Sequence, residues 1–151
     1  FASRVIGGER GVVIIEAMRS ERPWVLGLNE SGVVIWEVPL PAPSAACGPM
    51  DEVYSLGLGR VFVIRTDRVV AIDVFSGRVL WMTAIRERSK RTLKDVVPMD
   101  WIRPPGPPAR RPDGIHGFRA RLTSDVLELT SGTERVSVKI EPRTGKLISI
   151  E

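Results

Sequence analysis

The sequence is poor in the residues on which most catalytic and metal sites depend. Its 151 residues include a single cysteine, Cys47, and a single histidine, His116. One cysteine excludes an internal disulfide, and one histidine without a second His or Cys nearby is not the pattern of a zinc site or a histidine base. No apolar run approaches the roughly 20 residues of a membrane-spanning helix. We therefore expect no enzyme activity, no bound metal and no cofactor.

The excess of positive over negative charge is also small. Lys and Arg number 22 against 18 Asp and Glu, a formal net charge of +4. Outside a basic stretch at residues 86–94, positive and negative residues are mixed. The expected strands also lack the stripe of aromatic and cationic residues to which single-stranded nucleic acids bind. Binding of nucleic acid through that basic stretch is thus only a third-ranked hypothesis. The 14 glycines, 12 prolines and 43% hydrophobic content are typical of a turn-rich all-β domain.

The most informative segment is Ala71–Trp81, which has the pattern of a strand, a tight turn and a second strand. Gly77 can adopt the positive φ that the turn requires, and Asp73 can accept hydrogen bonds from the backbone amides that follow it. Ser76 can support the turn in the same way. Trp81, four residues after the glycine, can bury a large apolar face against a neighbouring sheet.

Two weaker copies of this pattern occur elsewhere in the chain. The first ends in Gly32 and Trp36, and the last has Gly145 followed four residues later by Ser149. Repetition of one hairpin pattern at a spacing of roughly 40–50 residues is typical of blade-built folds. The serine in place of tryptophan indicates a terminal unit with nothing further to dock against.

The segment Ala71–Trp81 resembles the tryptophan-docking repeat of quinoprotein-like (PQQ-like) β-propellers, Ala-x-Asp-x-x-Thr-Gly-Lys-x-x-Trp. Ser76 and Arg78 are conservative departures from it. The first copy has a shorter turn with Asn29 for Asp, and the last has Lys139-Ile140-Glu141 where Ala-x-Asp would fall. The resemblance implies an all-β, β-propeller-like fold of antiparallel four-stranded blades. The structural residues of the motif are then Gly32, Trp36, Asp73, Ser76, Gly77, Trp81 and Gly145.

We expect one domain over residues 1–151, with blades at about 5–40, 50–85 and 118–151 and an insertion at 86–117. The first strand is expected at Val12–Ala17, after a turn at Gly7–Gly11, and no helix is expected beyond one turn at Thr92–Val97. Closed propellers typically have four to eight blades, so this partial propeller leaves open sheet edges. Three alternatives remain: a fragment of a longer propeller, a part completed by a second copy or another subunit, or an open stack docked on a larger complex. The first residue, Phe1, is compatible with a removed leader or a longer protein.

The insertion combines a basic stretch, a Trp-Ile pair and a proline run. Proline cannot join a sheet ladder and favours an extended conformation, and long loops in compact domains are often functional. A solvated loop has little use for a tryptophan. We therefore predict that the insertion contacts a protein partner through Arg86, Arg88, Lys90, Arg91, Lys94, Trp101 and Arg103.

The resemblance also implies what this chain lacks. Quinone-dependent dehydrogenases of the superfamily stack their cofactor on a disulfide between adjacent cysteines and bind calcium, which a chain with one cysteine and three blades cannot reproduce. The most consistent hypothesis is a non-catalytic scaffold or accessory subunit that mediates protein–protein assembly in a larger complex. The alternative is a fragment of a propeller enzyme or ligand-binding propeller. The resemblance favours a periplasmic or membrane-associated cell-envelope location, with only indirect membrane contact.

Overall fold

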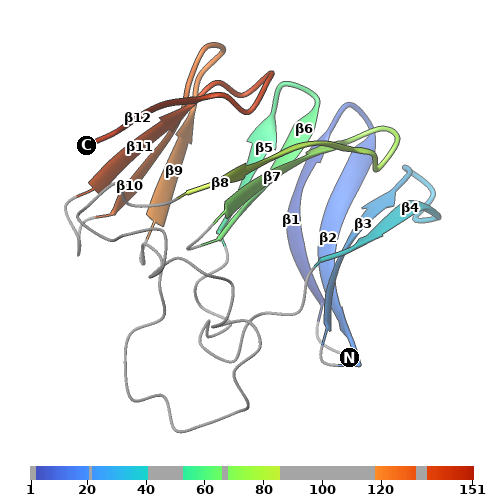
Figure 1. Cartoon of the computed structure of the whole chain (residues 1–151). Coiled ribbons are helices and arrows are strands. Elements are labelled where there is room, and N and C mark those ends of the chain that lie inside the picture. Colours follow the sequence, from blue (N-terminus) through green and yellow to red (C-terminus); the bar gives the residue numbers. More distant parts are fainter. Residues whose placement is uncertain (1–2, 21, 41–52, 66–67, 86–117, 132–135) are drawn as a thin grey trace, which may run out of the picture.

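The computed structural model describes residues 3–20, 22–40, 53–65, 68–85, 118–131 and 136–151. These residues form strands joined by turns, and no helix occurs among them (Figure 1). The strands are β1 (Ser3–Glu9), β2 (Val12–Arg19), β3 (Arg22–Leu28), β4 (Val34–Pro39), β5 (Val53–Gly57), β6 (Arg60–Ile64), β7 (Arg68–Asp73), β8 (Val79–Ala84), β9 (Phe118–Leu122), β10 (Leu127–Ser131), β11 (Val136–Ile140) and β12 (Leu147–Ile150).

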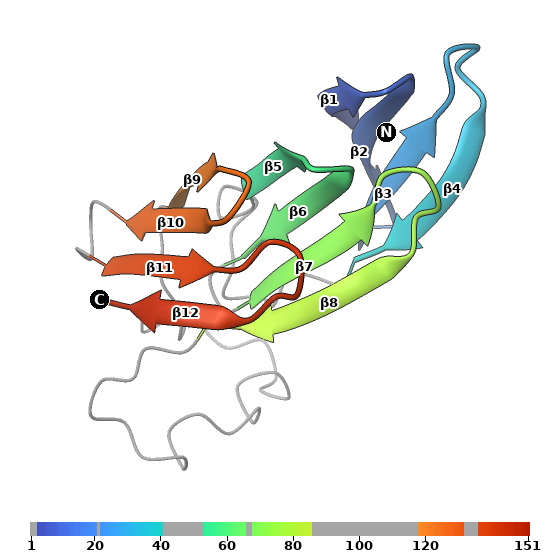
Figure 2. The same cartoon turned by 90° about the horizontal axis from the view of Figure 1, so that it is seen from above.

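The strands make three antiparallel sheets of four strands, each in simple sequence order. We call the sheets β1–β4, β5–β8 and β9–β12 blade 1, blade 2 and blade 3. Figure 2 shows them side by side, with blade 2 in the middle. The expected fold class, repeated four-stranded blades in an open, propeller-like arrangement, is confirmed. The insertion at 86–117 lies outside the described residues.

Blade 2 is apolar on both faces because a blade covers each of them. In β6, Val61 and Val63 belong to the core shared with blade 1, whereas Phe62 and Ile64 belong to the core shared with blade 3. Successive side chains of a strand point to opposite faces, so a strand covered on both sides has a continuous apolar run rather than alternation. This explains why residues 61–64 are all buried.

The blades meet along their first strands, where β5 contacts β1 on one side and β9 on the other. The last strands, β4, β8 and β12, follow the docking turns and lie at the opposite edge of their sheets. Each of these strands is joined to its neighbour with a register shift close to the motif, at Gly27/Leu28, Ala71/Ile72 and Lys139/Ile140. The shared irregularity shows that the three motif copies are structurally equivalent.

The prediction for the beginning of the chain was wrong in one respect. Gly7, Gly8 and Glu9 belong to β1, a strand that was expected to be a turn. The turn consists of Arg10 and Gly11, both with positive φ (47° and 81°). β1 was missed because its glycines weaken the apolar pattern, although they are paired with Ile14 and Val13 in the ladder. The single turn predicted at 92–97 lies outside the described residues.

Candidate functional site

The junction between blades 1 and 2 is built around one indole ring. Trp36, on β4, is buried, and its Nε1 donates a hydrogen bond to the carbonyl oxygen of Val74 at 2.7 Å. A Cβ added to Gly77 in the next blade would come within 2.7 Å of this ring. A Cβ added to Gly27 in its own blade would also clash with the ring. The indole thus lies between two glycines that allow its close approach.

Blades 2 and 3 meet in the same way. The Nε1 of Trp81, on β8, donates to the carbonyl oxygen of Pro142 at 3.0 Å. A Cβ added to Gly145 would lie 2.5 Å from the Trp81 ring, and the hydroxyl of Thr83 donates to the carbonyl of Gly145. The Phe62 ring packs beneath, with its centroid 5.8 Å from that of Trp81. In both junctions the blade that comes first in the chain supplies the tryptophan, and the blade that follows supplies the turn glycine.

A side-chain oxygen closes the docking turn in blades 1 and 2. The Oδ1 atom of Asp73 accepts hydrogen bonds from the amides of Phe75 and Ser76 at 2.8 and 3.0 Å. The Oδ1 atom of Asn29 does the same for Ser31 and Val33 at 2.9 and 3.0 Å. Such turns hold the glycine in the conformation that receives the ring.

The carboxylate of Asp73 is stabilised in its charged form. Burial alone would raise its pKa, but hydrogen bonds from Ser76 and Phe75 and the nearby Arg60 guanidinium outweigh burial and lower the pKa below its ordinary value. The negative charge of Asp73 therefore stabilises the turn at pH values above the pKa of this carboxyl group.

The first copy of the docking turn, in blade 1, receives no indole ring from the described residues. Gly32 has φ of 79°, close to the 72° of Gly77 and the 78° of Gly145. Yet among the described residues no atom lies within 4 Å of a Cβ placed on Gly32. The conformation that receives an indole in blades 2 and 3 is thus formed and unfilled in blade 1.

The apolar face around this turn is also uncovered. Val13 of blade 1 pairs with Leu28 as Val61 of blade 2 pairs with Ile72, so the two valines are equivalent. Val61 is 0% exposed because blade 1 covers it, whereas Val13 is 39% exposed and Val5, which pairs with Ile15 in the ladder, is 68% exposed. We define the open face as four apolar side chains of blade 1 that point away from blade 2 and are at least partly exposed: Val5, Val13, Ile15 and Leu28. Leu26, on the same face, is only 4% exposed.

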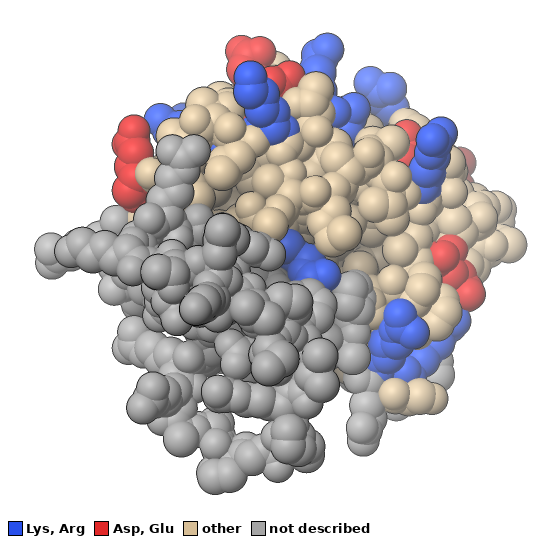
Figure 3. Space-filling view, viewed as in Figure 1, with Lys and Arg blue, Asp and Glu red and all other residues tan. Residues whose placement is uncertain are grey.

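One ion pair lies on the same side of blade 1 as the open face, because Glu37 pairs with Leu26 in the ladder. The Arg19 guanidinium pairs with the Glu37 carboxylate at 2.9 Å and stacks over the ring of Trp24 at 5.3 Å. Figure 3, viewed as in Figure 1, shows charged side chains mostly around the rim of the described part, with basic side chains also near its middle.

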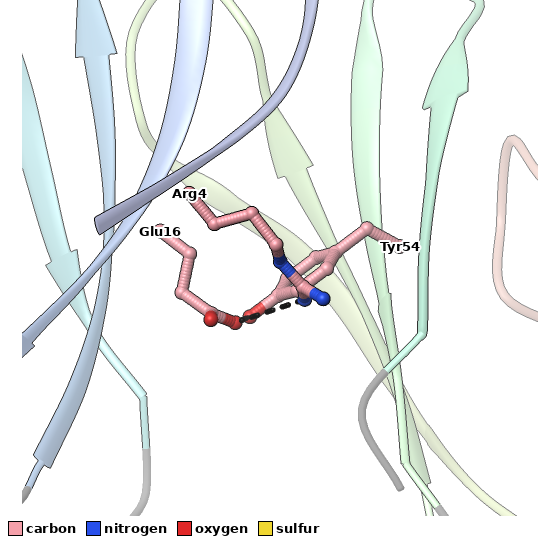
Figure 4. Close-up of polar contacts among 3 residues, drawn as sticks. All are labelled: Arg4, Glu16 and Tyr54. Carbon is pink, nitrogen blue, oxygen red and sulfur yellow. Dashed lines mark hydrogen bonds and ion pairs between the residues drawn. The ribbon is translucent and has the colours of Figure 1, made fainter. Parts of the chain in front are cut away.

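Blades 1 and 2 are additionally joined by polar contacts that the sequence did not reveal. The hydroxyl of Tyr54 donates to the Glu16 carboxylate, and the Arg4 guanidinium lies 3.5 Å from the same carboxylate and 5.3 Å from the Tyr54 ring centroid (Figure 4). Glu9 accepts a hydrogen bond from the amide of Gly59 at 2.9 Å. These contacts link blade 1 to blade 2, although the second carboxylate oxygen of Glu9, Oε2, is buried without a hydrogen-bond partner.

The structure brings the seven predicted motif residues into the three turns and two indole junctions described above. The predicted partner-binding residues lie outside the described residues: Arg86, Arg88, Lys90, Arg91, Lys94, Trp101 and Arg103. The role of Gly27 was not predicted. The sequence did contain a signal for it, since Gly27 occupies the position of the alanine in Ala-x-Asp. Tyr54 and Glu16 gave no signal, since their contact joins residues far apart in the sequence.

Nothing in the described part of the chain groups three or more His, Cys, Asp or Glu residues closely enough to hold a metal ion. His116 and Cys47 lie outside that part. The described residues also contain no helix of the length and hydrophobicity needed to cross a membrane. The expected absence of enzyme activity, metal and cofactor stays a prediction.

No family model and no curated protein matches this sequence. Among solved structures, a europium-containing methanol dehydrogenase matches with a TM-score of 0.56 at 15% identity, over 97% of this chain and 25% of its own. BamB from Moraxella catarrhalis matches with a TM-score of 0.54 at 10% identity, over 98% of this chain and 37% of its own. These likenesses show that the chain shares a propeller-like fold of four-stranded blades with part of each neighbour. The chain spans well under half the length of either neighbour.

Proposed function

We propose that this chain is a non-catalytic structural part of a larger assembly, which it joins through the open face of blade 1. The observation that carries the proposal is the contrast between two equivalent apolar surfaces. Val61 and its neighbours on blade 2 are covered by a blade, whereas Val13 and Val5 on blade 1 are exposed beside an unfilled docking turn. Apolar side chains that are exposed on a face whose equivalent is buried in the next blade indicate an interaction site.

The difference in length between this chain and the two structural neighbours supports the same proposal. The methanol dehydrogenase and BamB chains that match are longer than this one, so a likeness over 25% and 37% of their lengths corresponds to part of a propeller. A partial propeller of about three blades leaves a blade face without its usual cover. The insertion residues Arg88 and Trp101 remain our proposed second contact with a protein partner.

A pair of matched substitutions tests the proposal. Val13→Lys places a charge in the open face, and Ile148→Lys places the same charge on blade 3, at an isoleucine that is 51% exposed. We expect the chain in an extract of its native source to migrate in a complex well above the mass of the 16.7 kDa monomer. Val13→Lys should release it and Ile148→Lys should not, because only the first buries a charge on assembly.

The result that contradicts the proposal is a wild-type chain that migrates as a monomer in the extract, or equal behaviour of the two variants. Circular dichroism of both purified variants provides the control for folding.

A further inference from the structure

We infer that the occupant of the open face is a partner β-sheet blade that inserts an indole ring against Gly32, and that it is not a second copy of this chain. This inference deepens the proposed function and rests on it. It specifies the chemistry of the partner: a four-stranded blade whose last strand carries a tryptophan.

The two junctions inside the chain define the rule. In each, a tryptophan on the last strand of one blade lies against the turn glycine of the following blade, and its Nε1 donates to the carbonyl of the residue three positions before that glycine. Gly77 and Gly145 are filled in this way, and Gly32 is not. The matching acceptor in the shorter turn of blade 1 is the carbonyl of Glu30, which follows Asn29 as Val74 follows Asp73.

Blade 3 cannot supply the missing ring. Its motif has Ser149 in place of tryptophan, and Ser149 pairs with Lys139. In blade 2 the same pair is Trp81 with Ala71. A tryptophan needs a small residue beneath it, so Lys139 occupies the space over which an indole would lie. The last blade lacks both the ring and the small residue beneath it.

The outer face of blade 3 is also chemically wrong for the open face. Phe118, Ala120 and Leu122 pack toward blade 2, so the intervening Arg119 and Arg121 point away from it. The side chains that point outward on blade 3 are Arg119, Arg121, Glu128, Thr130, Ser137, Lys139 and Ser149. A head-to-tail copy would bury these charged residues on Val5, Val13 and Leu28 without partners, which is costly. Blade 3 has the polar outer face of a terminal capping repeat.

A symmetric dimer, in which two copies pack their open faces together, does not provide the missing ring for a different reason. Packing two open faces together would place two unfilled turns in one interface, and the described residues would supply no free indole for either of them. The Trp24 ring of blade 1 is already covered by the Arg19 guanidinium, which is itself paired with Glu37. In neither arrangement do the described residues of a second copy fill the space at Gly32.

A photo-crosslinking experiment in the native source tests this inference. Val13→p-benzoylphenylalanine places the crosslinker in the open face, and Thr130→p-benzoylphenylalanine places it on the polar outer face of blade 3 as a matched control. A second variant adds Gly32→Asn, since asparagine tolerates positive φ while its side chain occupies the space of the ring. The crosslinked peptides are identified by mass spectrometry.

We expect the Val13 crosslinker to form an adduct with a strand of a blade that has a tryptophan four residues after a turn glycine. Gly32→Asn should reduce this adduct at least tenfold, and the Thr130 crosslinker should not form it. An adduct with a second copy of this chain, with a partner that has no such blade, or one that persists in Gly32→Asn, would overturn the inference. Absence of any adduct from a chain that still migrates in a large complex would overturn it too, while leaving the proposed function intact.

Discussion

At the scale of single residues, each filled junction consists of one ring, one glycine and one carbonyl oxygen. The Trp36 ring contributes apolar burial, and its Nε1 hydrogen bond at 2.7 Å satisfies the Val74 carbonyl away from water. These two contributions can be separated, because phenylalanine retains most of the apolar ring but has no N–H group to donate.

Trp36→Ala should lower the free energy of unfolding by about 3–5 kcal/mol, because a large buried ring is removed. Trp36→Phe should lower it by about 1–3 kcal/mol, mainly because the Val74 carbonyl loses its donor. Urea-induced unfolding of the purified proteins measures both values. Equal values for the two variants would show that the hydrogen bond, and not the packing of the ring, dominates the junction.

The Asp73 carboxylate makes the stability of the folded chain depend on pH. Since its pKa is lowered in the folded state, its stabilisation is complete above the unfolded-state pKa of about 3.9 and is lost as the pH falls through the lower folded-state pKa. Asp73→Asn should keep the turn, as Asn29 does in blade 1, at a cost of about 1 kcal/mol at pH 7. Its unfolding free energy should change less between pH 5 and pH 3 than that of the wild type. An identical decline in both proteins would exclude Asp73 as the source.

At the scale of the elements, the blades are linked mainly through their neighbours, as in other repeat proteins. Trp81→Ala removes the indole that joins blades 2 and 3 but leaves the contacts of Trp36 untouched. Amide hydrogen exchange should therefore accelerate in β9–β12 and remain slow in β2 and β3. A uniform acceleration over all three blades would show instead that the chain opens as a single unit.

Much of this architecture was predictable from the sequence. The hairpin pattern at Ala71–Trp81 and its two weaker copies predicted the strands of the repeated four-stranded blades, and the first strand expected, Val12–Ala17, corresponds to β2. β1 was the exception, because Gly7 and Gly8 pair in the ladder without offering side chains that form a pattern. The equivalence of Gly27 and Ala71 was visible in the motif and was missed.

Contacts across blades were not predictable in the same way. The Tyr54–Glu16 hydrogen bond and the Glu9–Gly59 contact depend on how the sheets stack, which no local pattern encodes. Nor does the sequence state that Gly32 is unfilled, since its local turn resembles the two that are filled. The vacancy follows only from the order of the blades in space.

At the scale of the whole molecule, the two ends of the blade stack differ. Blade 1 presents an apolar face and an unfilled glycine turn, whereas blade 3 presents a polar face with Lys139 and Ser149 in place of the small residue and the ring. The stack therefore has one end suited to docking and one end suited to solvent.

The open face should be detectable in the isolated chain. A dye such as ANS, which fluoresces on exposed hydrophobic surface, should bind the purified native protein, and Val13→Lys should reduce its fluorescence because Val13 lies in the open face. Ile148→Lys should have little effect. Equal loss in both variants, or none in either, would contradict the placement of the exposed apolar surface on blade 1.

The most direct test of the docking rule compares alanine at the filled and the unfilled glycine. Both Gly77 and Gly32 have positive φ, so alanine introduces backbone strain of about 1–2 kcal/mol at either site. At Gly77 the new Cβ would also lie 2.7 Å from the Trp36 ring, whereas no described atom lies within 4 Å of it at Gly32. We predict from urea unfolding of the purified proteins that Gly77→Ala loses about 1–3 kcal/mol more stability than Gly32→Ala. Equal losses at the two positions would contradict indole docking as the link between blades and the vacancy of blade 1.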